Sequence, residues 1–243
     1  MRIYAFILAL VFMLIQQGML FSQPSHAQWT SLLKKHVSES GAVNYKGLAQ
    51  DRSEIDAYLN VLRKARPDES KWSRDEQLAY WINAYNAFTI ELVLDHYPIK
   101  SIKDIAGGLI GINTPWDISF IHLQGKTFSL NDIEHHIIRK NFEDPRIHFA
   151  LVCAAKSCPQ LRRESYEAST LSAQLDDQGK LFLNDPSKNN VSPSKALLSP
   201  LFNWYGMDFK KSGTLAEWVS RYSSVPLAKQ RIEYGEYDWS LND

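Results

Sequence analysis

The chain has 243 residues and no net formal charge, because 27 lysine and arginine residues balance 27 aspartate and glutamate residues. A neutral chain lacks the broad positive field that nucleic-acid-binding proteins use, so we expect no nucleic-acid partner. The length lies within the range of one domain that buries a substantial core.

The N-terminus has the pattern of a secretory signal peptide. Arg2 precedes an apolar run over residues 3–15, and Ser25-His26-Ala27 fits a small-x-small cleavage site. The run is shorter than the roughly 20 residues that a membrane-spanning helix needs, which disfavours the alternative of an uncleaved anchor. We therefore expect residues 1–27 to be removed after Ala27. Residues 28–243 would then form one exported domain without a membrane span, in the periplasm or in the medium.

Apolar residues at helical spacing predict helices over 29–37 and 52–65. The strongest helical pattern follows Ser73, which forms a capping box with Glu76 in front of the run QLAYWINAYNAFTIELVLDHY. Apolar side chains cover most of the circumference of this helix, so we expect it to be mostly buried. Pro98 is expected to end it.

A glycine-rich segment and a predicted hairpin come next. Residues 107–115 contain GGLIG, which lacks the glycine spacing and the Lys-Ser/Thr pair of phosphate-binding loops, so we interpret them as a loop. Residues 118–128 have a hairpin pattern that turns at Gln124-Gly125. Ser129, followed by Asp132, predicts the start of a helix that continues through Arg139.

The segment RIHFALVC, residues 146–153, is apolar along almost its whole length, and this pattern predicts a strand that is buried on both faces. Helical spacing recurs over 173–181, 199–209 and 214–222, around a short predicted strand at 191–194. A few strands among many helices predict an α+β fold, in which helices pack on a small, mostly antiparallel sheet.

On the predicted helix 129–139, a carboxylate lies on the face that should point inward. The apolar residues that define this face are Leu130, Ile133, Ile137 and Ile138. Glu134 lies within the face, and His135 and His136 flank it. Burial of a carboxylate is costly unless it is hydrogen-bonded or paired, so we expect Glu134 to hold a partner. The alternatives are a catalytic role and a structural bond to a backbone amide or to an arginine such as Arg139 or Arg146.

Three residues near the predicted strand could carry chemistry. Strand alternation would place His148 and Cys153 on opposite faces, so His148 is interpreted as a core histidine, with a base role only if the chain bends. The two cysteines of an exported chain, Cys153 and Cys158, suit a disulfide. Cys158 also precedes Pro159, and a thiol at a helix N-terminus has a lowered pKa. A nucleophilic thiol and a disulfide both remain open.

Two asparagines and the remaining histidines complete the candidate residues. Asn83 and Asn86 lie three residues apart on the buried helix, where their amides would anchor a loop or serve as oxyanion donors. His135 and His136 point about 100° apart on a helix, so they cannot share an ion. A metal-dependent hydrolase built on His122, His135 and Glu134 is therefore the weakest hypothesis, and we expect no metal and no cofactor.

Five segments resemble, in order, a family known as domain of unknown function 547: WINAYNA, SLNDIEH, DPRIHFALVCAAKSCPQL, LFNWYGMDF and YDWSLN. The resemblance implies a fold similar to that of papain-like and transglutaminase-like cysteine hydrolases. It also implies a Cys-His-Glu catalytic set, which would be Cys153, His135 and Glu134, with His148 as a competing base. The order differs from papain, where the cysteine comes first. Adjacent Glu134 and His135 on one helix can hardly bond each other, so Glu134 would instead orient His148.

Two hypotheses follow. The leading one is an exported thiol hydrolase that cleaves an amide or related acyl bond in a peptide-like or acyl substrate, with Cys153 as nucleophile. The other is a non-catalytic binding or scaffold domain of the cell envelope, in which Cys153 and Cys158 form a disulfide. The thiol content of the native protein distinguishes them.

Overall fold

The computed structural model of the protein describes residues 23–65, 67–105, 114–227 and 231–243. The apolar run at 3–15 and all but the last two residues of the predicted loop at 107–115 lie outside these ranges. Within them, no helix combines the length and the apolar character needed to cross a bilayer.

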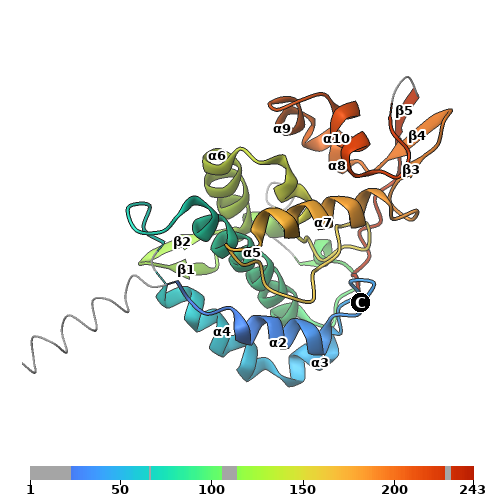
Figure 1. Cartoon of the computed structure of the whole chain (residues 1–243). Coiled ribbons are helices and arrows are strands. Elements are labelled where there is room, and N and C mark those ends of the chain that lie inside the picture. The colour runs from blue at the N-terminus through green and yellow to red at the C-terminus, as the bar shows by residue number, and fades with distance from the viewer. Residues whose placement is uncertain (1–22, 66, 106–113, 228–230) are drawn as a thin grey trace, which may run out of the picture.

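One long buried helix, α5 (Arg74–His96), forms the centre of the N-terminal part of the fold. The capping box is confirmed, because the Glu76 N–H donates to the Ser73 hydroxyl at 3.3 Å and the Ser73 N–H donates to the Glu76 carboxylate at 2.5 Å. Every residue from Leu78 to Leu94 is buried, as the apolar pattern predicts. The helices that lie on one side of α5 in Figure 1 are α2 (Ala27–His36), α3 (Tyr45–Gln50) and α4 (Arg52–Lys64).

The predicted hairpin is confirmed. Strand β1 (Ile121–Leu123) pairs in antiparallel fashion with β2 (Lys126–Phe128). Gln124 and Gly125 connect them with φ angles of 54° and 75°. Positive φ at both central residues is typical of the tight turn that matches the twist of a hairpin. Two short 3₁₀ helices precede it, η1 (Ile102–Asp104) and η2 (Pro115–Asp117).

The helix predicted after Ser129 is present, and most of it is a π-helix, η3 (Asp132–Ile138), which continues into α6 (Arg139–Phe142). The Asp132 N–H donates to the Ser129 hydroxyl at 3.0 Å, and the Ser129 N–H donates to the Asp132 carboxylate at 2.8 Å. Glu134 is buried together with its apolar neighbours, so the predicted inward face is correct. Short π-helical segments often occur at functional sites.

The strand predicted over 146–153 is wrong. Its first part is a 3₁₀ helix, η4 (Pro145–Phe149), and residues 151–153 are irregular. Pro145 suits the first turn of a helix, and the Asp144 carboxylate accepts a hydrogen bond from the Arg146 N–H at 3.0 Å. The segment is apolar because it lies in the core between other elements, and an apolar run alone does not distinguish a buried strand from a buried helix.

The C-terminal part has a second core, to which η4 contributes Phe149. Its elements are α7 (Leu171–Leu183), β3 (Asn190–Val191), β4 (Lys195–Leu198), α8 (Leu201–Trp204), α9 (Gly206–Lys210), α10 (Leu215–Tyr222) and β5 (Arg231–Tyr234). Strand β4 lies between β3, which is antiparallel to it, and β5, which is parallel. The α+β class is therefore confirmed. In place of the expected single small sheet, the described residues form two separate ones, of two and three strands.

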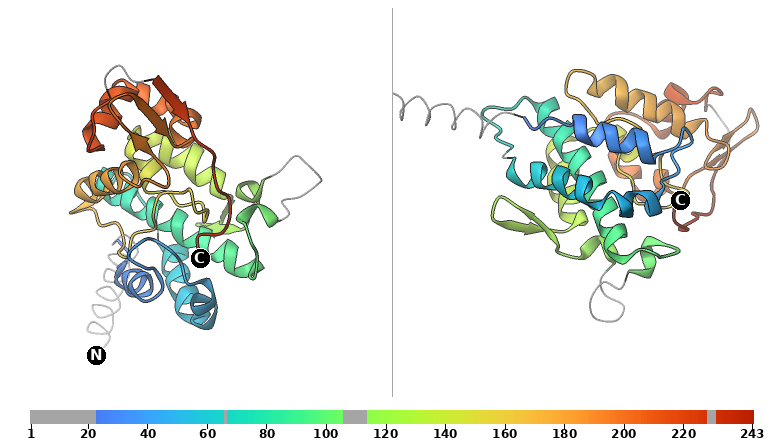
Figure 2. Two further views of the ribbon diagram at one scale, coloured as in Figure 1. Left: turned by 90° about the vertical axis from the view of Figure 1, so that its right-hand side faces the viewer. Right: turned by 90° about the horizontal axis from the view of Figure 1, so that it is seen from below.

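After β5, the chain returns from the C-terminal part to the N-terminal helices (Figure 2). The Leu241 N–H donates to the Lys100 carbonyl at 2.8 Å, and the Val43 N–H donates to the Asn242 carbonyl at 2.7 Å. The buried Tyr45 hydroxyl donates to the Asn242 side chain at 2.7 Å. The last residues also bond the loop that contains both cysteines, because the Lys156 N–H donates to the Ser240 carbonyl at 2.9 Å and the Asn242 N–H donates to the Ala154 carbonyl at 3.0 Å.

Candidate functional site

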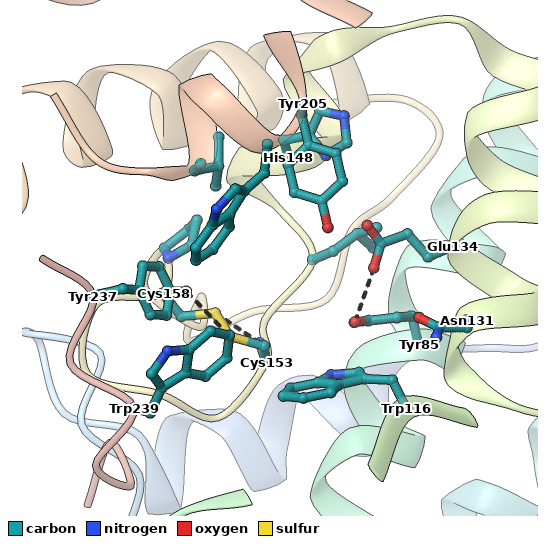
Figure 3. A pocket seen from close by; sticks show the side chains of 14 residues that line it. Tyr85, Trp116, Asn131, Glu134, His148, Cys153, Cys158, Tyr205, Tyr237 and Trp239 are labelled. Atoms are coloured by element: carbon teal, nitrogen blue, oxygen red, sulfur yellow. Dashed lines mark hydrogen bonds between the residues drawn. A yellow bond between two sulfur atoms is a disulfide. The ribbon is translucent and has the colours of Figure 1, made fainter. Parts of the chain in front are cut away.

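A cavity of about 190 Å³ lies where four parts of the chain meet (Figure 3). They are η3, the loop after η4, the turn between α8 and α9, and the C-terminal segment, which is residues 235–243 after β5. It brings together four of the residues that the sequence singled out, namely Glu134, His148, Cys153 and Cys158. Most of the remaining wall is aromatic and consists of Tyr85, Trp116, Trp204, Tyr205, Tyr237 and Trp239. This cavity is the candidate functional site.

The rings on one side of the cavity contact one another. The ring centroid of Tyr237 lies 4.5 Å from that of Trp239 and 4.9 Å from that of Trp204. Trp116 meets Trp239 edge to face at 5.6 Å. Such offset and edge-to-face pairs stabilise each other, so these rings form a preorganised aromatic wall. Trp204 remains 50% exposed, which places it at the rim.

Glu134 has the partner that its burial requires, and this partner is neither of the predicted arginines. The Tyr85 hydroxyl donates to the Glu134 carboxylate at 3.1 Å. The Tyr205 hydroxyl lies beside the same carboxylate (Figure 3). Burial, reinforced by the negative charge of Glu134, raises the pKa of both tyrosines, so their hydroxyls remain protonated donors.

His148 is oriented by Asp208, a residue of α9 that the sequence interpretation missed. The His148 Nε2 atom lies 2.8 Å from an Asp208 carboxylate oxygen, and Arg139 Nε donates to the same carboxylate at 2.6 Å. A carboxylate only accepts, so Nε2 carries a proton and Nδ1 of the neutral ring is an acceptor. The imidazole also stacks on Tyr205, with centroids 3.8 Å apart.

Burial and hydrogen bonding shift the pKa of His148 in opposite directions. Burial lowers the pKa of His148, and the hydrogen bond to Asp208 acts in the other direction. The same hydrogen bond, together with the one from Arg139, holds the pKa of Asp208 well below its usual range. His148 is therefore a neutral ring beside an ionised carboxylate. The only sequence signal for Asp208 is its position as a lone acid between Met207 and Phe209.

Cys153 and Cys158 form a disulfide, with Cα atoms 6.1 Å apart, and both line the cavity. The Tyr237 hydroxyl lies 3.2 Å from Cys153 Sγ. Strand alternation does not apply to this irregular segment, so the expectation that His148 and Cys153 diverge is wrong. Both side chains reach the same cavity (Figure 3).

The other candidate histidines lie elsewhere. Arg139 Nη1 is 2.7 Å from His135 Nδ1, and His135 is not among the described residues that line the cavity. His136 pairs with Asp132 at 3.1 Å, and the exposed His122 is 3.1 Å from the Thr127 hydroxyl. Cys153, His135 and Glu134 are thus not gathered at one cavity. In the described part of the chain, no three His, Cys, Asp or Glu side chains form a group that could hold a metal ion.

Asn83 and Asn86 anchor loops. Asn86 Nδ2 donates to the Ala150 carbonyl at 3.0 Å, and its Oδ1 accepts from the Val152 N–H at 2.9 Å. Asn83 makes the same pair of bonds to the backbone of Tyr166, at 2.8 and 2.9 Å. The Asn86 bonds hold the segment that leads directly into Cys153. Both side-chain amides therefore anchor the backbone of a loop, which is the first of the two predicted roles.

A known protein family matches the region of the chain that contains most of the residues of this site. Residues 69–183 match the model of a family described as protein of unknown function, DUF547. The matched region includes Glu134, His148 and both cysteines, whereas Asp208 and the rings of the C-terminal segment lie beyond it. No curated protein matches the chain, and neither does any solved structure. The chain therefore contains a region of the DUF547 family, and this region includes three of the five segments that resemble it, WINAYNA, SLNDIEH and DPRIHFALVCAAKSCPQL.

Proposed function

We propose that this protein is a non-catalytic binding domain, exported to the cell envelope, whose aromatic cavity takes a small organic ligand. The observation that carries the proposal is the Cys153–Cys158 disulfide in the cavity wall. A thiol hydrolase attacks with a thiolate, and a disulfide sulfur is not one. The preorganised rings supply the apolar contact area that ligand cavities use.

The second candidate is the thiol hydrolase with the papain-like core that the sequence resemblance implies. It is favoured by His148 and Asp208, because a neutral imidazole held by a carboxylate lies at the same cavity as Cys153. In this proposal an external thiol first reduces the disulfide. Cys153 is then the nucleophile, His148 the base, and Asp208 orients the imidazole in place of Glu134.

Alkylation after mild reduction separates the two candidates. The protein is purified without reductant, and one half is reduced with a small thiol that is then removed. Both halves are treated with iodoacetamide at pH 7 and analysed by intact mass. The disulfide predicts no alkylation before reduction. After reduction, the hydrolase predicts that Cys153 reacts faster than a model thiol with a pKa of about 8.5, and the binding domain predicts no such excess.

A variant with an obligatorily free thiol completes the test. Cys158→Ser leaves Cys153 reduced. If this thiol alkylates rapidly, if His148→Gln slows the reaction, and if the variant cleaves an amide or acyl ester, the binding-only proposal is wrong. His135→Gln serves as the matched control, because His135 does not line the cavity. Alkylation at the rate of a model thiol would eliminate the hydrolase.

A further inference from the structure

Glu134 places a carboxylate in the wall of the cavity. Its side chain is buried, with 6% of the residue exposed, and it accepts a hydrogen bond from Tyr85. Within the described residues it has no ion-pair partner, and the nearby Arg139 guanidinium pairs with Asp208 instead. Buried charges in proteins are normally paired. A ligand with a positive charge would provide the missing partner.

The aromatic wall suits a cation as well. A positive group over the face of a tryptophan or tyrosine ring is attracted by the ring quadrupole. One ring of the wall already holds such a group, because the Lys103 ammonium lies 3.7 Å from the ring centroid of Trp239. Trp116, Trp204 and Tyr237 extend the same wall around the cavity.

Most polar groups of the cavity are already engaged with the protein, which disfavours a ligand rich in hydroxyl groups. Asn131 Nδ2 donates to Asp117 at 2.5 Å, and His148 Nε2 bonds Asp208. The Tyr237 hydroxyl lies against Cys153 Sγ. A sugar would have to displace these bonds, whereas a quaternary ammonium group has no hydrogen-bond donor or acceptor to satisfy.

The size of the cavity limits the ligand. An apolar cavity of about 150 Å³ holds benzene. At about 190 Å³, this cavity accommodates a group only somewhat larger than benzene. That volume is enough for a trimethylammonium head with a short substituent, which extends toward the rim at Trp204.

We propose that the ligand of this cavity is a small quaternary alkylammonium compound, held between the aromatic wall and the Glu134 carboxylate. The inference rests on the binding function proposed above and specifies its ligand class. It requires a carboxylate, π faces and a cavity of suitable volume, all of which the described residues provide.

The test compares two probes of equal shape and different charge, choline and its neutral isostere 3,3-dimethylbutan-1-ol. Binding to the full exported protein, in its non-reduced form, is measured by calorimetry and by tryptophan fluorescence. We expect choline to bind at least about tenfold more tightly than the isostere, which corresponds to about 1.4 kcal/mol. Glu134→Gln should reduce this difference by at least about threefold and leave binding of the isostere unchanged, whereas the part of the preference that comes from the aromatic wall should persist.

The controls keep the result interpretable. Glu69→Gln removes one exposed negative charge away from the cavity, and the preference for choline should persist. If Glu134→Gln does not fold, Trp116→Leu replaces it, and this variant should weaken choline more than the isostere. Equal binding of both probes would overturn the cation inference and leave the binding function standing. A cavity that binds neither probe nor any member of a neutral and anionic fragment set would overturn both proposals.

Discussion

His148 Nε2 lies 2.8 Å from a carboxylate oxygen of Asp208, although 60 residues separate the two in the chain. This bond joins the 3₁₀ helix in front of the cysteines to a short helix of the C-terminal part. It determines which ring nitrogen carries the proton, and it holds the imidazole against Tyr205 at the cavity. The DUF547 match ends before Asp208, so the site depends on a residue outside the matched region.

The first prediction concerns this bond. Asp208→Asn retains an acceptor for His148 but removes the charge that pairs with Arg139. We expect the free energy of unfolding to fall by about 1 to 3 kcal/mol, measured by urea titration. The hydrogen bond to Asp208 raises the pKa of His148, so NMR titration should show a lower His148 pKa in the variant. An unchanged or higher pKa would contradict the proposed role of Asp208.

The second prediction concerns Glu134 and Tyr85. Glu134→Gln should keep the fold and cost about 1 kcal/mol, because the amide oxygen still accepts from the Tyr85 hydroxyl. Glu134→Leu should cost more, since it leaves that hydroxyl without its acceptor. In a double-mutant cycle of Glu134→Leu and Tyr85→Phe, the two losses should be less than additive by at least about 0.5 kcal/mol. Strict additivity would show that the bond contributes nothing.

The third prediction tests the anchoring amide beside Cys153. Asn86→Ala removes the partners of the Ala150 carbonyl and the Val152 N–H, both in the core. We expect a loss of about 2 to 4 kcal/mol in the free energy of unfolding, because each unsatisfied buried group costs about 1 to 3 kcal/mol. Asn60→Ala, on an exposed position of α4, is the control and should change stability by less than about 0.5 kcal/mol. A loss as small as in the control would show that the loop does not depend on Asn86.

The fourth prediction concerns His26, which the proposed signal cleavage after Ala27 would remove. In the structure His26 Nδ1 is 2.7 Å from the buried Tyr58 hydroxyl, and burial lowers the pKa of His26 from 6.5 to about 4. The unfolded chain therefore binds a proton at higher pH than the folded chain does. The neutral His26 ring therefore contributes up to about 3 kcal/mol to the free energy of unfolding. This contribution is fully present above pH 6.5 and is lost as the pH falls toward 4.

Two chains make this measurable, one starting at Gln23 and one at Gln28. The unfolding free energy of the longer chain should decrease more steeply between pH 6.5 and pH 4. His26→Gln in the longer chain should remove the excess slope. Equal slopes in both chains would contradict a buried, neutral His26. Intact mass of the exported protein then determines which start is natural, and a start at Gln28 means that the mature protein lacks this contact.

Local signals explain what the sequence predicted well. The capping box at Ser73, the Gln124-Gly125 turn and the helical spacing along α5 all depend on residues within one or two turns of each other. The burial of Glu134 also follows from its neighbours on one helix face. Backbone geometry at this range is determined by local sterics and hydrogen bonding, so it can be predicted without knowledge of the tertiary contacts.

The sequence by itself therefore determined the α+β class, the main helices, the hairpin and the identity of most of the polar candidates. Only the tertiary structure decided that residues 145–149 form a 3₁₀ helix rather than a strand, that His148 rather than His135 reaches the cavity of Cys153, and that Asp208 orients it. Tyr237 and Trp239 reach the wall from the far end of the chain. These features depend on contacts between segments many residues apart, and an apolar run or a lone carboxylate carries no information about which distant segment will pack against it.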